Sequence, residues 1–305
     1  MDRIAVIANP VASQFTGGAH RDVMAVLSKT HSVEAIWPSS ATEATEAARR
    51  AATEGAGIVI AMGGDGMVHH VAQGLIGAEG ALGIIPAGTT NVVARILGLP
   101  SRPVRAARHI ARASFVQPIG TARMTLTRGT AETTHHAMFG CGFGLDAEVV
   151  IRADADPYRK YRFGSIHYAR TAIGVGLGTF PKRRPHATVT SGERTAEATS
   201  LLIQFRDIYT YFGKLPLRLS RESPDPMSAL VLGRLRRHRI PQIAFDVLAG
   251  RDLDVVKGFE VWTGVDSVEL GADPSIAAQA DGESLGLVDA AVVTWAPNSL
   301  NVIAG

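Results

Sequence analysis

The stretch that most constrains the fold is Gly57–Val71, GIVIAMGGDGMVHHV. Its first part, Ile58–Met62, is a short apolar run bounded by glycines, which is typical of a strand buried on both faces of a parallel sheet. A glycine turn follows, and apolar residues from Val68 onward recur at helical spacing. A strand, a glycine turn and a helix in this order direct backbone N–H groups and a helix N-terminus toward a phosphate.

The turn itself is Gly63-Gly64-Asp65-Gly66. Its glycines let the backbone approach an anion without interference from Cβ atoms. Asp65 is the unusual member, because a carboxylate repels phosphate. It either holds Mg²⁺, directly or through water, or handles a proton, or it only caps the helix in a tight turn.

A second junction of the same kind comes one strand later. The strand around Ile84 leads into Pro86–Asn91, PAGTTN, and a helix over Val92–Leu97. If the two strands are adjacent in a parallel sheet, both turns face one crevice at the carboxyl ends of the strands.

The order of elements predicts two domains. Residues 1–100 alternate strand and helix, starting with the strand Ile4–Ile7, which argues for a parallel α/β layer. Ser40 and Glu43 form a capping box for a helix through Thr53. From about residue 118 alternating runs such as Ala122–Thr127 predict an antiparallel β domain. One helix, over about 163–177, interrupts it, and the segments 290–295 and 297–302 close the chain.

Composition narrows the class of protein further. The chain has 305 residues, a net charge of +3 and a single cysteine, Cys141, which excludes an internal disulfide and fits a reducing cytosol. No apolar run reaches the roughly 18 residues of a membrane span. Basic clusters at 182–184 and 234–239 are either solvated surface or sites that attract anionic lipid headgroups.

GGDG followed by IPAGTTNVVAR resembles the catalytic domain of the diacylglycerol kinase and sphingosine kinase superfamily, and is most similar to the soluble bacterial lipid kinases. NAD kinases share GGDG and the fold, but their second motif runs differently. The residues that favour the lipid kinases are Pro86, Gly88, Thr89, Asn91, Ala94 and Arg95.

The resemblance implies an N-terminal three-layer α/β domain with a parallel sheet and a C-terminal antiparallel β-sandwich domain. The α/β domain would comprise residues 1–121 and 287–305, and the β-sandwich domain, with catalytic and lipid-binding residues, 122–286. ATP and Mg²⁺ would be the cofactors, with Asp65 organising the metal and the phosphates. The residues implied to bind the nucleotide are Asn9, Pro10, Ser40, Gly63, Gly64, Asp65, Gly66, Thr89 and Asn91.

Two more segments match the family. In GCGFGLDA, Asp146 would be a helix N-cap in most proteins, but the resemblance places it in the catalytic cleft. In QADGESLG, Asp281-Gly282 alone predicts a hairpin turn, and the resemblance makes Glu283 the base that takes the proton from the lipid hydroxyl. Asp65, Asp146 and Glu283 are therefore the expected catalytic residues.

The sequence also departs from the family pattern. Met67 replaces the usual threonine after GGDG, His70 replaces a common acidic residue, and Val92 stands where aspartate is common. Nothing in the sequence shows what His70 does, and a histidine on the helix surface is expected. Bacterial relatives often hold a structural Mg²⁺ at an Asp-Gly turn. Asp225 could be retained from it, but the glycine is not, which disfavours this site.

These features predict an ATP-dependent lipid kinase that phosphorylates a hydroxyl, with diacylglycerol as first acceptor and a sphingoid base or another long-chain alcohol as second. A non-catalytic lipid- or nucleotide-binding relative is the alternative, and the second motif disfavours an NAD kinase. We expect a cytoplasmic protein that contacts the inner, anionic membrane surface transiently and has no nucleic-acid partner. A homodimer is left open.

Overall fold

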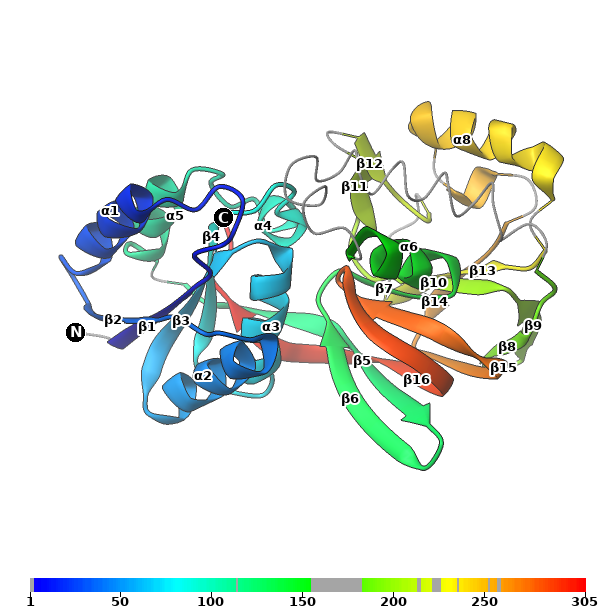
Figure 1. Cartoon of the computed structure of the whole chain (residues 1–305), viewed down its shortest axis with the longest axis horizontal. Helices are drawn as coiled ribbons and strands as arrows, with labels where there is room; N and C mark the ends of the chain where they lie inside the picture. Colours follow the sequence, from blue (N-terminus) through cyan, green and yellow to red (C-terminus); the bar gives the residue numbers. More distant parts are fainter. Residues whose placement is uncertain are drawn as a thin grey trace. The chain divides into compact units, whose positions relative to one another are not determined.

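The computed structural model describes residues 3–113, 115–154, 183–212, 215–220, 226–234, 236–251, 253–256 and 259–305. The chain divides into two compact units (Figure 1). Unit 1 comprises Met1–Thr121 and Pro297–Gly305, and unit 2 comprises Ala122–Ala296. Within the described part of the chain, no helix is long and apolar enough to cross a membrane.

Unit 1 is built on a parallel sheet in the order β4-β3-β1-β2. The end of β16 adds a further parallel contact, with Val302 opposite Leu82 of β4. The strands are β1 Arg3–Ala8, β2 Ser32–Ile36, β3 Ala56–Gly63, β4 Ala81–Pro86 and the last residues of β16 Glu283–Val302. The helices are α1 Gly17–Leu27, α2 Ala41–Thr53, α3 Asp65–Leu75, α4 Val92–Ile96 and α5 Pro103–Ile110.

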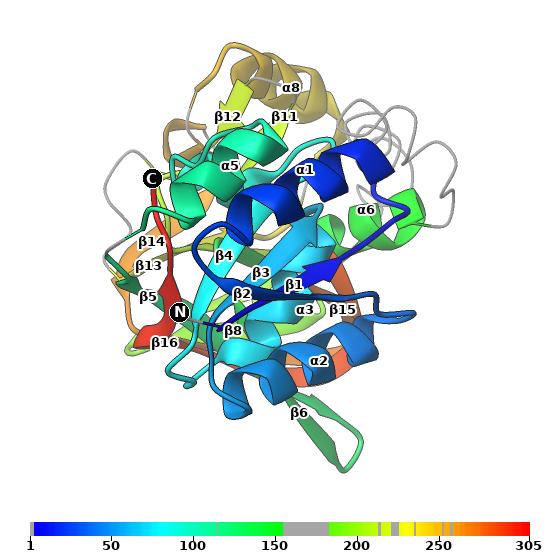
Figure 2. The ribbon, with the colours of Figure 1, turned by 90° about the vertical axis from the view of Figure 1, so that its left-hand side faces the viewer.

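Helices cover both faces of this sheet, as expected for a three-layer α/β domain. α1 and α5 pack together on one face, and α2 and α3 pack together on the other (Figure 2). The middle strands are therefore buried on both sides: all of β4, and β3 from Val59 onward, is inaccessible to solvent. This explains why these strands are continuous apolar runs rather than alternating ones.

The packing of α2 on α3 depends on small residues. A Cβ placed on Gly74 of α3 would lie 2.4 Å from the Thr45 carbonyl oxygen and 2.7 Å from Ala48 Cβ, both in α2. The same construction on Gly18 of α1 meets no atom within 4 Å. Gly74 is thus required for the close approach of two helices, whereas Gly18 is not.

We therefore expect opposite effects from one substitution at two helical glycines. Gly74→Ala should lower the free energy of unfolding by about 1–3 kcal/mol, because the helices must separate. Gly18→Ala should raise it by about 0.4–1 kcal/mol, because alanine restricts the unfolded chain more than glycine does. Urea unfolding followed by circular dichroism measures both. A Gly74→Ala protein as stable as wild type would show that α2 and α3 do not approach this closely.

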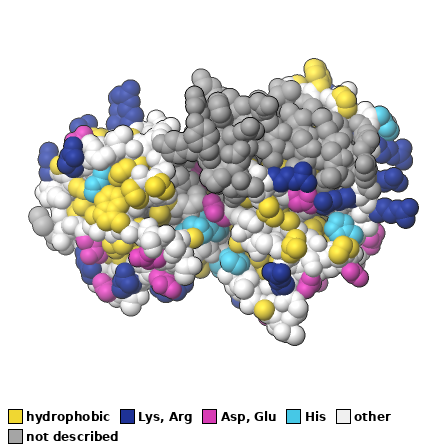
Figure 3. Space-filling model, viewed as in Figure 1, with side chains coloured by type: hydrophobic (Ala, Val, Ile, Leu, Met, Phe, Trp, Pro, Cys, Tyr) yellow, Lys and Arg dark blue, Asp and Glu magenta, His cyan; other side chains and the backbone are white. Residues whose placement is uncertain are grey.

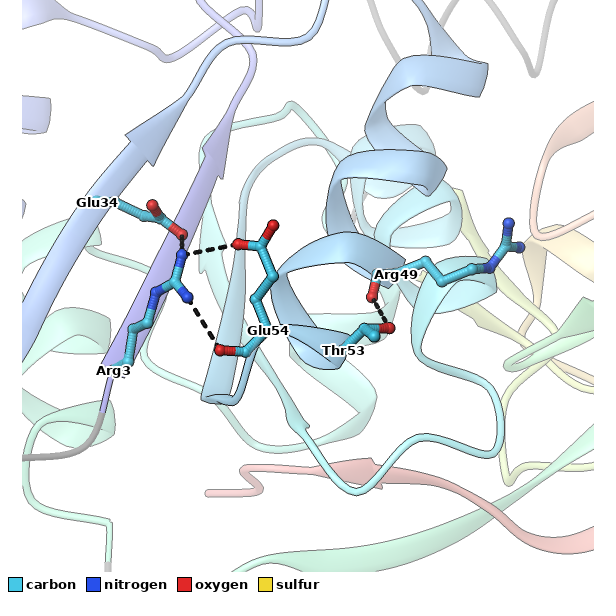
Figure 4. A network of polar contacts seen from close by, with 5 residues as sticks. All are labelled: Arg3, Glu34, Arg49, Thr53 and Glu54. Carbon is cyan, nitrogen blue, oxygen red and sulfur yellow. Dashed lines mark hydrogen bonds and ion pairs between the residues drawn. The ribbon is translucent and has the colours of Figure 1, made fainter.

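An ion-pair network lies at the amino end of the strands, the edge opposite the glycine turns. Arg3 contacts Glu34 and Glu54 at 3.0 Å each and also donates to the Glu54 carbonyl oxygen (Figure 4). The hydrogen bond to Glu54 is the largest influence that raises the pKa of Arg3. Because all three side chains are well exposed, solvent screens the attraction and the network contributes little to stability.

Unit 2 is mainly antiparallel. Its strands run in the order β14-β13-β10-β7-β15-β16, with β8–β9 paired onto β15 and a β5–β6 hairpin. The strands are β5 Gln117–Arg128, β6 Ala131–Ala137, β7 Gly140–Phe143, β8 Ala187–Ser191, β9 Arg194–Ala198, β10 Ser200–Gln204, β13 Met227–Leu232, β14 Glu260–Val265 and β15 Ser267–Ala280. The short strands β11 Thr210–Phe212 and β12 Leu215–Leu217 form a separate pair, and the helical segments are α6 Leu145–Asp154, α8 Ile240–Leu248, η2 Arg237–Arg239 and η3 Leu253–Val255.

The predicted fold class, an α/β domain with a parallel sheet followed by an antiparallel β domain, is confirmed. One boundary differs. The chain returns to unit 1 at Pro297 rather than at residue 287, because β16 continues along β15 as a long hairpin as far as the pair Ser267–Thr294. The predicted closing strand and the short segment after it are both parts of β16. The helix predicted over about 163–177 lies outside the described residues.

Candidate functional site

The carboxyl ends of β1, β3 and β4 form one continuous edge in unit 1. The amide of Asn9, just after β1, donates to the Met62 carbonyl oxygen of β3 at 3.0 Å. The amide of Ala87, just after β4, donates to the Gly63 carbonyl oxygen at 2.8 Å. The segments that follow the three strands are therefore held side by side, which is where ligands bind in open α/β sheets.

The two glycine turns touch each other through their backbones. A Cβ placed on Gly88 would lie 2.5 Å from Gly64 Cα, so neither turn could keep its path if residue 88 carried a side chain. α3 begins at Asp65, and its N-cap, Gly64, supplies no side-chain cap. The first amides of an α-helix need an outside acceptor. This end of α3 is thus suited to an anion.

The Asp65 side chain reaches from α3 to α4. Its carboxylate oxygen Oδ1 accepts a hydrogen bond from the amide of Val93, in the first turn of α4, at 3.3 Å. The side chain is half-buried and joins the amino ends of α3 and α4. A carboxylate at this place suits Mg²⁺ carried in with phosphates, because Mg²⁺ prefers oxygen ligands and commonly uses one or two carboxylates together with substrate phosphates.

Asn91 and Thr89 complete the second turn. Asn91 has a left-handed backbone with φ of 49°, its Oδ1 accepts from the Gly88 amide at 3.0 Å, and its Nδ2 donates to the Gly88 carbonyl oxygen at 2.7 Å. The Asn91 side chain therefore shapes the turn. Thr89 is exposed, and its hydroxyl lies 2.9 Å from the Ser13 hydroxyl.

The remaining residues implied to bind the nucleotide follow β1 and β2. Asn9 Oδ1 accepts from the Val11 amide at 3.0 Å, which makes a local turn, and Pro10 is exposed. Ser40 is the N-cap of α2, where its hydroxyl accepts from the Glu43 amide at 3.1 Å. The structure brings Asn9 and Pro10 beside the glycine turns, and it places Ser40 at the α2 N-terminus beyond the carboxyl end of β2.

The departures from the family pattern also have a place in the structure. A Cβ on Gly63 would lie 2.6 Å from Met67 Cβ, so Met67 covers the first glycine of the turn. His70 is half-buried, not fully on the surface, and its carbonyl oxygen accepts from the Thr45 hydroxyl at 2.9 Å. Its helix neighbour His69 is buried and contacts the His70 ring edge to face.

Sequence reasoning missed an aromatic cluster near this edge. Trp37, which follows β2, contacts Phe15 edge to face at 5.8 Å between ring centroids and His20 at 4.6 Å. Trp37 is 45% exposed and Val11, in the same unit, is 75% exposed. Figure 3 shows hydrophobic side chains gathered on this face of unit 1. Isolated aromatic residues in segments of low periodicity gave no sequence signal for the cluster.

Unit 2 contains a second polar centre, around Asp146. The residue lies in the first turn of α6, but its carboxylate does not cap the helix. Oδ2 accepts hydrogen bonds from the Tyr209 hydroxyl and from Gln279 Nε2, and Gln279 Nε2 also contacts the Tyr209 hydroxyl at 3.1 Å. A Cβ on Gly142 would lie 2.5 Å from Oδ2, so glycine is required beneath the carboxylate.

Burial controls the titration of this centre. It raises the pKa of Asp146, and the hydrogen bonds from Tyr209 and Gln279 offset part of that rise. Burial and the nearby Asp146 carboxylate raise the pKa of Tyr209 well above its ordinary value, so the hydroxyl keeps its proton and donates. Burial likewise raises the pKa of Cys141, which makes this thiol an inert core residue.

The hairpin that carries Glu283 is anchored to the same centre. Asp281 and Gly282 form a two-residue turn with φ of 53° and 82°, positive at both positions as a type I′ turn requires. The buried Asp281 carboxylate accepts from the amides of Met138 and Phe139 at 2.9–3.0 Å. Gln279 Oε1 accepts from the Gly282 amide at 2.8 Å. Gln279 thus joins Asp146 to the turn that precedes Glu283.

The structure therefore groups Asp146 with the Glu283 hairpin in unit 2, and Asp65 with the glycine turns in unit 1. Tyr209, Gln279 and Asp281 were not identified as site residues from the sequence, although Gln279 and Asp281 lie inside the QADGESLG segment. Asp225 lies outside the described residues. Within those residues, no group of three or more His, Cys, Asp or Glu side chains is placed to hold a metal ion.

Tyr209→Phe tests the buried centre. Because the folded pKa of Asp146 is raised, the folded state binds its proton more tightly, and ionisation costs stability as pH rises above the ordinary value of 3.8. Loss of the Tyr209 donor removes an influence that lowers this pKa. We expect Tyr209→Phe to cost about 1.5–3 kcal/mol at pH 7 and less near pH 4, because the Tyr209 hydroxyl favours the ionised form of Asp146.

Urea unfolding at both pH values measures this difference. The matched control is Tyr209→Phe in an Asp146→Asn background, where the cost should lose its dependence on pH because no carboxylate titrates there. An equal cost at both pH values in the wild-type background would show that Tyr209 does not stabilise an ionised Asp146.

The proteins that this chain resembles agree with the phosphate-binding geometry of unit 1. Unit 1 is an α/β domain with two glycine turns at the carboxyl edge of a parallel sheet, a class built to hold a phosphate-bearing ligand. Residues 3–124 match the family model of the diacylglycerol kinase catalytic domain. This part of the chain is therefore similar to the diacylglycerol kinase catalytic domain, which supports the resemblance read from the sequence.

Two curated relatives match about two fifths of this chain. The diacylglycerol kinase of Bacillus subtilis (strain 168) is 34% identical over 125 residues, which is 39% of this chain and 41% of that protein. The diacylglycerol kinase of Mycobacterium tuberculosis (strain ATCC 25618 / H37Rv) is 31% identical over 124 residues, 40% of each. The match thus spans about two fifths of the length of these relatives.

Solved structures extend the likeness in fold to the whole chain. A crystal structure of a diacylglycerol kinase from Bacillus anthracis str. Sterne superposes with a TM-score of 0.70 at 17% identity, over 100% of this chain and 97% of that one. A second structure from the same organism gives a TM-score of 0.74 at 20% identity, with the same coverage. At this identity the superposition establishes the fold of both units.

Proposed function

We propose that this protein is an ATP-dependent lipid kinase that transfers the γ-phosphoryl group of ATP to a lipid hydroxyl, with diacylglycerol as acceptor and phosphatidic acid as product. One observation carries the proposal: two glycine turns, Gly63–Gly66 and Gly88–Asn91, meet backbone to backbone at one sheet edge, inside a domain that matches diacylglycerol kinases. The kinase family supports phosphoryl transfer, and diacylglycerol comes from the names of the relatives alone.

In this proposal the α3 N-terminus and the exposed Thr89 hydroxyl bind the phosphates of ATP. Asp65 orients Mg²⁺, which would neutralise the phosphate charge, and its bond to Val93 fixes the carboxylate while ATP binds. Catalysis of this kind depends mainly on positioning and charge neutralisation. Glu283 takes the proton of the lipid hydroxyl. Asp146 lies on the side of the site where the acceptor lipid binds. Asn91, Asn9 and Pro10 act by shaping the turns.

Two observations favour the alternative of a relative that binds ATP or lipid without transferring phosphate. Met67 supplies no hydroxyl and lies over Gly63, and Val93 already occupies one oxygen of Asp65. Met67→Thr distinguishes the two functions. In a kinase weakened by Met67 the variant gains turnover, whereas in a non-catalytic protein it gains none.

One assay tests the proposal directly. Purified protein is given radiolabelled ATP with Mg²⁺ and, in separate reactions, diacylglycerol, sphingosine, a long-chain alcohol and NAD. Label in phosphatidic acid supports the proposal, and label in another lipid changes the acceptor. Label in NADP would replace it by an NAD kinase. ATP binding by calorimetry with no labelled product would favour the non-catalytic alternative.

A further inference from the structure

The α5 helix of unit 1 carries a row of arginines that the proposed chemistry does not use. Arg105 and Arg108 are three residues apart and project from one side of the helix. Arg112 follows in the turn after the helix. All three are exposed, while Ala106, Ala107 and Ile110 are buried against the core of unit 1. The arginine side of α5 is therefore the side directed to solvent.

The chain segment that contains these arginines has no acidic side chain. The sequence from residue 80 to residue 131 contains seven arginines and no aspartate or glutamate. Within the described residues none of the three guanidinium groups forms an ion pair. The neighbouring helix α1 contributes one arginine, Arg21, and one carboxylate, Asp22, which cancel in net charge. Within the part of the chain that the structure describes, the charge of Arg105, Arg108 and Arg112 is thus not balanced by an ion pair.

A hollow and exposed apolar side chains adjoin the row. The hollow has a volume of about 650 Å³ and is lined by Arg105, Arg108, His109, Arg112, Phe115 and Gln117. His109 Nε2 donates to the Ala304 carbonyl oxygen at 2.7 Å, which fixes one wall of the hollow. Phe115 is 72% exposed and Val116 is 41% exposed.

We propose that this surface, the α5 basic face (Arg105, Arg108, Arg112 and Phe115), docks unit 1 on an anionic lipid bilayer. Guanidinium groups bind phosphates by paired hydrogen bonds, and each basic residue near an anionic membrane adds to its attraction. An exposed aromatic side chain beside them gains by entering the interface, as in peripheral amphipathic helices. Nucleic acid and other soluble polyanions would use the arginines but would leave Phe115 and Val116 in water.

The choice of a bilayer rests in part on the proposed lipid kinase function, because an enzyme that acts on a membrane lipid must reach the bilayer surface. The surface differs from the basic clusters at 182–184 and 234–239 that the sequence suggested, since those lie in unit 2. It also lies outside the glycine turns, so its removal leaves the phosphate-binding edge intact.

Sedimentation with vesicles tests the docking. Wild type is mixed with vesicles of phosphatidylcholine alone and of phosphatidylcholine with an equal amount of phosphatidylglycerol. We expect strong binding only to the second, weakened by salt. The triple variant Arg105→Gln/Arg108→Gln/Arg112→Gln should bind on the order of a hundredfold more weakly, since each arginine accounts for about fivefold. Phe115→Ser should bind roughly tenfold more weakly.

The matched control changes three exposed arginines elsewhere, Arg49→Gln/Arg50→Gln/Arg194→Gln, with the same loss of charge. If the control loses as much binding as the α5 variant, net charge and not this surface attracts the bilayer, and the proposal is overturned. The proposal is also overturned if the wild-type protein does not bind anionic vesicles. An α5 variant that loses heparin binding while its vesicle binding stays normal overturns it as well, because the partner is then a soluble polyanion.

A kinase assay in neutral detergent micelles separates this inference from the proposed function. The α5 variant should phosphorylate micellar diacylglycerol at the wild-type rate, because its catalytic residues are unchanged. If no form of the protein phosphorylates any lipid, yet wild type binds anionic vesicles and the α5 variant does not, the docking surface is supported and the kinase function fails. Equal melting temperatures exclude misfolding as the cause of lost binding.

Discussion

Asp65→Asn is expected to lower lipid phosphorylation by roughly hundred- to thousandfold, the usual loss when a preorganised electrostatic contact at a reacting centre is removed. Asparagine keeps the size of the side chain and a carbonyl oxygen for the Val93 amide, but it removes the negative charge that would orient Mg²⁺. The melting temperature should therefore change little, since asparagine can still accept the hydrogen bond from the Val93 amide.

The measurement is turnover with saturating ATP and Mg²⁺, together with a thermal melt of each protein. Asp22→Asn is the control, because Asp22 is an exposed carboxylate in the same unit, on α1 and away from the glycine turns. Normal turnover in Asp65→Asn would remove Asp65 from the mechanism. Its contact with Val93 would then indicate a structural role, as a link between the amino ends of α3 and α4.

Glu283→Gln is expected to lower kcat by about 10²–10⁴-fold, the usual contribution of a general base. The residue is the first of β16, directly after the Asp281-Gly282 turn, and that turn is anchored on both sides, by Asp281 to the Met138 amide and by Gln279 to the Gly282 amide. Glutamine keeps the size of the side chain and its hydrogen-bonding capacity but cannot accept the proton. ATP affinity should stay near the wild-type value.

Glu269→Gln provides the control, since Glu269 is exposed on β15 of the same hairpin. Single-turnover phosphorylation and ATP titration of both variants separate chemistry from binding. If Glu283→Gln transfers phosphate at the normal rate, Glu283 is a structural residue of the turn. Asp146 would then be the next candidate base, because burial raises its pKa toward the range in which a base works.

The order of strands and helices in unit 1 could be predicted from the sequence because its signals are local. Continuous apolar runs such as Ile4–Ile7 and Ile58–Met62 indicate buried parallel strands. Ser40 and Glu43 marked the start of α2, and the structure confirms that cap. The length of β16 could not be predicted, because its pairing with β15 is set by residues far away in the chain and not by its own periodicity.

The glycine turns and the hairpin of the candidate site could also be predicted from the sequence, because their geometry depends on glycine. The supporting contacts were not. Tyr209 reaches Asp146 across 63 positions of sequence and Gln279 across 133. A lone tyrosine or glutamine gives no sign of such a partner. The sequence shows that Met67 lacks the hydroxyl of the usual threonine. Its position over Gly63 depends on the path of the turn, so only the structure could show it.

The contact of β16 with β4 has a consequence for how the protein is made. Ile303 donates its amide to the Leu82 carbonyl oxygen and belongs to the core cluster that contains Ile4 and Ile60. On the ribosome, residues 122–296 emerge before this core can close, a delay of roughly 10–40 s at ordinary elongation rates. Unit 1 therefore stays partly assembled during this time, with apolar surface exposed to a chaperone. A gene fragment ending at Thr121 would produce a domain with both glycine turns but an open core.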